Sequence, residues 1–507
     1  MKNKIKENYN HLKKNVFLVN RNIKKFIKEN YKYILIFSMI YFIALMPLIR
    51  ANINYNDDLG RVRYGYRDFG FGRYVSDYLS ILLHGSRNIS DISPMTTLLA
   101  IIVMALTSVL ILRIILKEKK IKWYHIVAAL PIGMNPYFLE CYAYKYDAPY
   151  MALSVLFAII PFIFYKKDKN NKNILFIISS IICTFLMASS YQASAGLYPI
   201  ITIILALTML NNKEEKKEIF KFIYKAIIGY GLGLIIFKLL LPDTSSFYIH
   251  PEILSLKDFF PKAIANYQKF YTTIYEETKL IWLIFIIAIL MIFTVKEIIQ
   301  SKEKKTIAAL GTITSLILMF LLVFGVYPFL TEPIFQPRSM YAFFILISIL
   351  SIKNCACKHN LISKVSAICL AYAFLTTFLI FGNACSEQYK YNQLRLTLLI
   401  NDINNLDVKN EETLKIDIEG TIGRSNKIDG IVNKLPVFNK LLPPTLGDNS
   451  YIWQVYEIAT YYDIPNVEFN TLTKNEISDN EMKLVKETRY HSIYQKDNYV
   501  LIKLNKI

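Results

Sequence analysis

Long apolar runs recur along this chain, and one of them, Tyr33–Ile49, contains no charged residue. A run of about 20 apolar residues matches a hydrocarbon core roughly 30 Å thick, whereas helices of a soluble core are usually shorter and carry a polar stripe. Inside a bilayer, backbone groups are satisfied only in helices or closed barrels, and these runs are continuous rather than alternating. The sequence therefore predicts an α-helical polytopic membrane protein.

We expect about eleven transmembrane helices. Their approximate ranges are 33–49, 95–116, 122–138, 147–165, 173–190, 193–210, 219–241, 279–296, 305–327, 339–352 and 364–382. Pro131 and Pro136 in the third range, and the close spacing of the fifth and sixth, also allow broken or re-entrant helices. These alternatives change the expected number of spans by about two.

The formal net charge of +20 is concentrated in the segments between alternate apolar runs. These basic segments are Lys2–Lys32, Lys117–Lys122, Lys166–Lys172, Lys213–Lys225, Lys296–Lys305 and Lys353–Lys364. By the positive-inside rule they face the cytoplasm, so the intervening segments and the C-terminal segment 383–507 face outward. The charge therefore indicates membrane topology, and we expect the lipid bilayer rather than nucleic acid as its partner.

The chain divides into three parts. Residues 1–30 form a basic arm whose apolar residues recur at helical spacing, which suits a cytoplasmic helix lying on an anionic leaflet or a solvated helix. Residues 31–382 form the transmembrane domain. Residues 383–507 form an extracytoplasmic α/β domain, with strands expected over 414–419 and 499–504 and helices over 451–462 and 475–487. Tyrosines in the first of these helices are candidates for sugar stacking or for core packing.

The first outward segment is crowded with charge. Two adjacent carboxylates, Asp57 and Asp58, follow the first apolar run, with Arg61, Arg63 and Arg73 close behind. A carboxylate can take a proton from an acceptor hydroxyl, and arginines can hold a phosphate leaving group through charge-assisted hydrogen bonds. This combination suits glycosyl transfer, although a solvated loop with local ion pairs has the same composition.

Four short blocks resemble the glucosyl transferase II family of polytopic enzymes that decorate bacterial O-antigens and related surface glycans. They are Asn56–Arg61 followed by Phe71–Arg73, then Tyr146–Ser154, Ser190–Ser194 and Pro337–Ser339, and the resemblance spans about residues 30–380. It implies a membrane fold similar to the C-type glycosyltransferases. It also implies transfer of a glucosyl or other hexosyl residue, by inversion, from a polyprenyl-phosphate donor to a surface glycan acceptor outside the membrane.

Roles for single residues follow from this resemblance together with residue chemistry. We expect Asp57 or Asp58 to act as general base or to bind the acceptor. The candidates for binding the donor phosphate are Arg61, Arg73, Arg338 and Lys145, and those for the sugar are Asp147, Tyr191 and Gln192. The alternatives are a helix-end role for Arg338, an interfacial ion pair of Lys145 with Asp147, and simple packing of Tyr191 and Gln192.

No cofactor is expected. The six cysteines have no metal-ligand spacing, and a polyprenyl donor needs no nucleotide site, which fits the lack of a glycine-rich phosphate loop. A divalent cation at Asp57 and Asp58 stays open as an alternative.

A polytopic transporter or a lipid-linked sugar flippase is the alternative function. Such proteins usually contain paired repeats with Gly- or Pro-broken helices at matching positions, and no such pairing is recognisable here. A membrane acyltransferase would be expected to carry a histidine-centred motif, whereas the six histidines are scattered.

Overall fold

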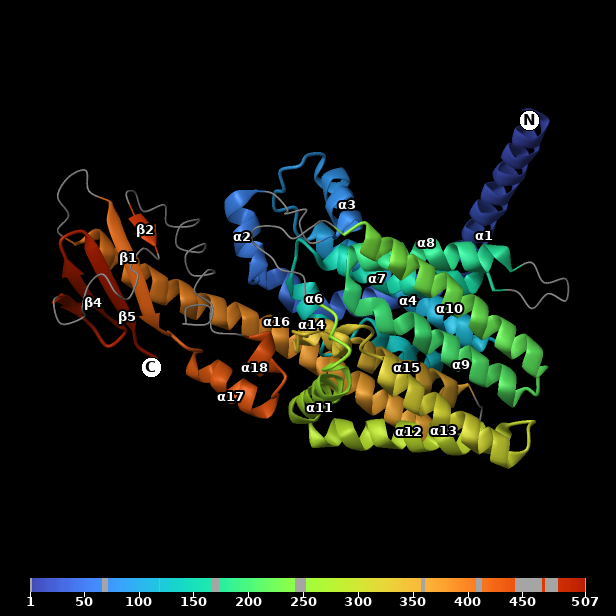
Figure 1. Cartoon of the computed structure of the whole chain (residues 1–507). Helices are drawn as coiled ribbons and strands as arrows, with labels where there is room; N and C mark the ends of the chain where they lie inside the picture. The colour runs from blue at the N-terminus through green and yellow to red at the C-terminus, as the bar shows by residue number, and fades with distance from the viewer. Residues whose placement is uncertain are drawn as a thin grey trace.

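The computed structural model of this chain describes residues 2–65, 72–117, 119–165, 173–241, 252–356, 361–406, 413–442, 467–469 and 482–506, with side chains from residue 24 onward. Most of these residues are helical. Long helices lie side by side in a bundle, and a small sheet lies beyond one end of it (Figure 1). The helix predicted over 451–462 and the apolar face of the N-terminal arm lie outside the described side chains.

Within the described ranges, seven helices are long and apolar enough to cross a membrane. They are the apolar part of α1 (Lys2–Ala51) from Lys24 onward, α4 (Met95–Leu116), η4 with α9 (Gln192–Gly196 and Leu197–Asn211), α10 (Lys216–Leu239), α12 (Leu280–Gln300), α13 (Lys305–Leu322) and α16 (Leu361–Asn404). Each overlaps a predicted span, because unbroken apolar sequence satisfies its backbone internally in lipid only as a helix.

Four shorter apolar helices coincide with the other four predicted ranges. They are α5 with η2 (Trp123–Ala129 and Leu130–Ile132), α7 with η3 (Ala148–Ile159 and Ile160–Ile163), α8 (Ile174–Ser190) and α15 (Ala342–Cys355). Two of them tighten into 3₁₀ turns at Pro131 and Pro161, where proline cannot donate the next helical hydrogen bond. The helix in the third predicted range is therefore interrupted. The total of eleven membrane spans stays a prediction.

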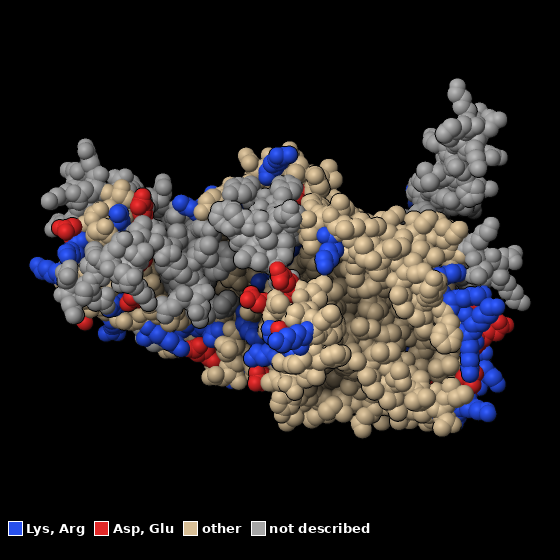
Figure 2. Space-filling model, in the orientation of Figure 1, with Lys and Arg blue, Asp and Glu red and all other residues tan. Residues whose placement is uncertain are grey.

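The charged residues lie at the two ends of the bundle. Figure 2 shows a broad band with few charged side chains, bounded at the end farthest from the sheet by clustered Lys and Arg. Exposed lysines at that end include Lys117, Lys119 and Lys213 in loops and Lys216 and Lys217 at the start of α10. An uncharged band between two charged ends is the surface expected of a protein that spans a bilayer.

The remaining described helices lie at the end of the bundle that faces the sheet, and Figure 1 labels all of them except η5. They are α2 (Asp57–Tyr64), α3 (Tyr74–His84), α6 (Phe138–Ala143), α11 (Phe259–Glu277), η5 (Tyr327–Phe329), α14 (Pro337–Met340), α17 (Asn426–Lys434) and α18 (Phe438–Leu441). The last two belong to the C-terminal segment, yet Phe438 and Leu441 are buried in the hydrophobic core of the bundle. The segment after α16 therefore returns to the transmembrane part.

Helix α16 connects the bundle to the sheet. It passes residue 382 without interruption, so the predicted domain boundary lies inside a helix. A side chain at Gly382 would collide with the backbone of Pro47 and Leu48, so glycine lets α16 approach α1 closely. Further along, Leu396, Leu399 and other apolar residues of α16 pack under the sheet as a second core.

The sheet contains five strands in the order β2-β1-β5-β4-β3 among the described residues. They are β1 (Leu414–Gly420), β2 (Val467–Phe469), β3 (Lys483–Glu487), β4 (His491–Lys496) and β5 (Tyr499–Leu504). Strand β1 is parallel to β2 and β5, whereas β4 is antiparallel to β5 and β3. The strands predicted over 414–419 and 499–504 are confirmed. The helix predicted over 475–487 is wrong for 483–487, which form an exposed edge strand paired with β4.

Candidate active site

Helix α2 places the two adjacent carboxylates at the end of the bundle that faces the sheet. The chain turns sharply after α1 through Asn52 and Asn56, which adopt positive φ angles of 40° and 44° that asparagine tolerates better than most residues. Asp57 and Asp58 then occupy the first turn of α2, where negative charge stabilises a helix. Gly65, in the left-handed conformation, ends the helix.

Asp58 is fully buried and connects two loops. Its Oδ2 accepts hydrogen bonds from the backbone N–H groups of Tyr55 at 3.2 Å and Lys145 at 3.1 Å. Its Oδ1 lies 4.0 Å from Nη1 of Arg61. Burial raises the pKa of the Asp58 carboxyl to about 7, although Arg61 opposes the shift. Such contacts are typical of a carboxylate that holds neighbouring backbone segments in place.

Arg61 and Lys145 are both held by carboxylates. Arg61 forms an ion pair with Asp147, which lies at the start of α7 and is 5% exposed. Lys145 Nζ donates to Asp91 Oδ2 at 2.6 Å and to Asn52 Oδ1 at 3.3 Å. The Arg61–Asp147 pair joins α2 to the start of α7. Lys145 joins the segment before α7 to Asn52 and Asp91 in earlier loops.

Arg338 is held by a carboxylate that sequence reasoning missed. Its backbone N–H and its Nη1 donate to the two oxygens of Glu140 at 2.8 and 2.6 Å, and Nη1 also donates to the hydroxyl of Tyr144. Glu140 is 2% exposed on the apolar helix α6. A lone acid in such a segment was the available signal, because buried charge is costly without a partner. The Tyr144 ring packs edge-on against Tyr55, with ring centres 4.9 Å apart.

Asp57 differs from Asp58 in its surroundings. It is only partly buried, and its carboxylate makes no hydrogen bond or ion pair with any residue that the structure describes. It interacts electrostatically with Arg61, Arg338 and Tyr144. Asp57 is thus a partly buried carboxylate in the electrostatic neighbourhood of two arginines, each of which pairs with another acid. We refer to Asp57, Asp58, Arg61, Glu140, Tyr144, Asp147 and Arg338 as the α2 cluster.

Arg73, Tyr191 and Gln192 border this cluster. The guanidinium carbon of Arg73 lies 5.2 Å from the centre of the Tyr191 ring, and Tyr191 interacts electrostatically with Arg338. Tyr191 is 3% exposed at the end of α8, so packing accounts for much of its surface. Gln192 is half-buried at the start of η4. Arg63, by contrast, is exposed on α2 beside Tyr64.

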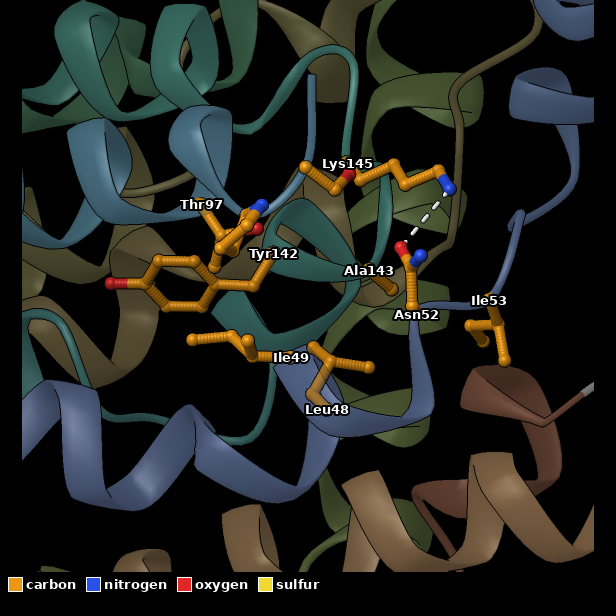
Figure 3. Close-up of a pocket in the computed structure, with 10 residues that line it drawn as sticks. Leu48, Ile49, Asn52, Ile53, Thr97, Tyr142, Ala143 and Lys145 are labelled. Carbon is orange, nitrogen blue, oxygen red and sulfur yellow. Dashed lines mark hydrogen bonds between the residues drawn. The ribbon is translucent and has the colours of Figure 1, made fainter. Parts of the chain in front are cut away.

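A small cavity lies beside the cluster (Figure 3). Its volume is about 20 Å³, and its lining includes Asn52, Tyr142 and Lys145, with Leu48 and Ile49 from the end of α1. In the close-up, the Lys145 ammonium points toward the Asn52 amide. Space of this size holds about one water molecule. A hexose therefore does not fit in this cavity alone.

Metal ligation has little support from the side chains that the structure describes. Among them, no three His, Cys, Asp or Glu side chains gather as a metal ion would need. Asp57 and Asp58 are adjacent, but the oxygens of Asp58 already face backbone donors and Arg61.

Two comparisons with known proteins bear on the identity of the chain. The model of the family described as glucosyl transferase GtrII matches residues 45–349, more than half of the chain, and this range contains every member of the α2 cluster. An uncharacterised 55.3 kDa protein from the gtrB 5′ region of Salmonella phage P22 is 28% identical over 451 residues, covering 85% of this chain and 90% of the phage protein. The predicted resemblance is confirmed, and this chain belongs to the glucosyl transferase GtrII family.

Proposed function

We propose that this membrane glycosyltransferase moves a glucosyl, or related hexosyl, residue from a polyprenyl-phosphate donor to a cell-surface glycan. The observation that carries the proposal is the environment of Asp57. The partly buried Asp57 carboxylate interacts electrostatically with both Arg61 and Arg338, and buried acids hold both guanidinium groups in place. A base beside fixed cations is what a displacement at a sugar carbon with a phosphate leaving group needs.

The reaction is a single displacement. Asp57 takes the proton of the acceptor hydroxyl while the acceptor oxygen forms a bond to the anomeric carbon. The bond between that carbon and the phosphate oxygen breaks, and the phosphate leaves with the electron pair. Arg61 and Arg338 stabilise the charge that builds on this phosphate, and Arg73 adds a third cation at the border of the cluster. Attack from the face opposite the leaving group inverts the anomeric carbon.

The remaining members of the cluster position these groups. Asp58 fixes the backbone of Tyr55 and Lys145, while Asp147 and Glu140 orient the two arginines. Catalytic geometry held by buried partners loses less energy to reorganisation during the reaction. The ion pair of Asp147 with Arg61 therefore favours a positioning role over the predicted contact with sugar.

The location of the cluster supports a reaction on the outer face of the plasma membrane. The cluster lies at the end of the bundle that faces the sheet, and the lysine-rich loops lie at the opposite end (Figures 1 and 2). By the positive-inside rule the lysine-rich end and the N-terminus face the cytoplasm, and the sheet lies outside. A polyprenyl-linked donor reaches this face within the bilayer and requires no nucleotide.

The test is mass spectrometry of surface glycans from a strain lacking the gene, complemented with the wild-type protein or with Asp57→Asn. The wild-type copy should restore a hexose-sized mass, and Asp57→Asn should not, although the protein still inserts. Arg61→Gln and Arg63→Gln form a matched pair, since both remove one charge from α2 and only Arg61 lies in the cluster. Restoration by Asp57→Asn would overturn the assignment of Asp57 as the base. A deletion strain with unchanged glycans would overturn the proposed transfer and favour a transporter or a different transferase.

A further inference from the structure

A second cavity lies at the opposite end of the bundle from the α2 cluster. Its volume is about 510 Å³, and it opens between the C-terminal ends of α4, α9, α12 and α15. This volume lies within the range of roughly 300–1,000 Å³ that is typical of small-molecule sites. The glycosyl transfer proposed above makes no use of this cavity.

Lysines dominate the charge of its lining. Lys117, Lys119, Lys296 and Lys353 line it together with one carboxylate, Glu297. Lys353 Nζ lies 3.2 Å from Glu297 Oε1, and Lys296 donates to backbone carbonyls at the end of α15. Lys117 and Lys119 are exposed, and among the described residues their ammonium groups form no ion pair. The cavity therefore keeps an excess of positive charge.

Asn211, which also lines this cavity, contains a buried hydrogen-bond acceptor. Asn211 is 8% exposed, and its Nδ2 donates to Glu297 Oε2 at 2.8 Å, which assigns Oδ1 as the acceptor. Within the described part of the chain, this Oδ1 is buried without a hydrogen-bond partner. A buried acceptor that lacks a donor is destabilising, so a bound hydroxyl group would satisfy it.

We propose that this cavity binds a phosphate group that carries a neighbouring hydroxyl. The lysine ammonium groups bind the phosphate, and Asn211 Oδ1 accepts a hydrogen bond from the hydroxyl. Phosphatidylglycerol offers both groups in its headgroup, and glycerol 3-phosphate offers them in solution. Ile115 and Leu116 lie beside the lysines and provide apolar contacts next to the headgroup of a lipid. Basic cavities between transmembrane helices are known to receive anionic headgroups.

The experiment uses the full-length protein in mild detergent and counts bound molecules by native mass spectrometry. The probes are phosphatidylglycerol, phosphatidic acid, phosphatidylcholine and glycerol 3-phosphate, each titrated separately. The test variant is Lys117→Ala with Lys119→Ala. Its matched control is Lys216→Ala with Lys217→Ala, which removes the same charge from exposed lysines of the same end outside the cavity. An additional variant, Asn211→Ala, tests recognition of the hydroxyl.

We expect phosphatidylglycerol to bind more tightly than phosphatidylcholine. The Lys117/Lys119 double variant should weaken this binding about thirtyfold, since each lysine near an anionic group contributes about fivefold, and the control should not. Asn211→Ala should reduce the preference for phosphatidylglycerol over phosphatidic acid. Binding of glycerol 3-phosphate would identify a soluble source, and its absence a lipid. Equal binding of phosphatidylglycerol and phosphatidylcholine, or equal loss in both double variants, would overturn the proposal.

Discussion

Replacing Asp58 with alanine should destabilise the protein, whereas the same change at Asp57 should not. The Asp58 carboxylate accepts two buried backbone hydrogen bonds, from Tyr55 and Lys145. Each buried N–H left without an acceptor costs about 1–3 kcal/mol. Removing a carboxylate whose charge is disfavoured by burial offsets part of this cost. We therefore expect a net loss of about 3 kcal/mol for Asp58→Ala.

For Asp57→Ala we expect a change within about 0.5 kcal/mol, because this carboxylate is partly exposed and makes no hydrogen bond with the described residues. Its activity should nevertheless fall by about 10²–10⁴-fold, the usual contribution of a general base. The change in stability therefore reports a positioning role, and the change in activity reports a catalytic role.

The assay is thermal unfolding of the purified proteins in one detergent, followed by tryptophan fluorescence, with glycan transfer measured on the same samples. Asp58→Ala should lower Tm by several degrees, and Asp57→Ala should keep the wild-type Tm with little activity. A wild-type Tm for Asp58→Ala, or an equal loss of Tm in both variants, would refute the assignment of positioning to Asp58 and catalysis to Asp57.

Three further perturbations test the surroundings of the cluster. Burial raises the pKa of Asp58 from 3.8 to about 7, so between these values the folded protein binds a proton that the unfolded chain does not. Its stability should therefore fall as pH rises from about 4 to about 7, and Asp58→Asn should flatten this part of a Tm-against-pH curve. Glu140→Gln should leave Arg338 poorly oriented and lower kcat about 10–100-fold with a smaller effect on KM, which transfer kinetics would measure. Tyr55→Phe removes the hydrogen bond to the Leu441 carbonyl and should cost about 1 kcal/mol in thermal unfolding; an unchanged Tm would show that α18 docks without it.

The transmembrane part was largely predictable because lipid imposes one strong rule on sequence. Every predicted range overlaps an apolar helix, including the one that breaks at Pro131. Whether the four shorter helices cross the membrane depends on neighbours that cover their ends, and apolar sequence alone does not encode this. The edge strand Lys483–Glu487 was missed because its hydrogen bonds come from β4, and an exposed edge strand carries no buried alternation that would reveal it.

The candidate site was only half predictable. Sequence identified Asp57, Asp58 and Arg61 by their charge next to a span, but it could not distinguish the two carboxylates. Their difference arises from burial by segments far along the chain, such as the backbone of Lys145. The pairing of Arg338 with Glu140 joins residues 198 positions apart. Contacts over such separations depend on how the bundle packs, which short motifs do not record.

Helix α16 is much longer than the hydrocarbon core of a bilayer is thick. Its 44 residues extend for about 66 Å at 1.5 Å per residue, roughly twice the thickness of a hydrocarbon core. About half of the helix must therefore project beyond the lipid, and it carries the sheet at a height set by the number of helical turns. Deleting or inserting four residues, slightly more than one turn, would move the sheet by about 6 Å along the helix axis and rotate it by about 40°. The length of this one helix therefore sets the separation between the membrane and the C-terminal sheet.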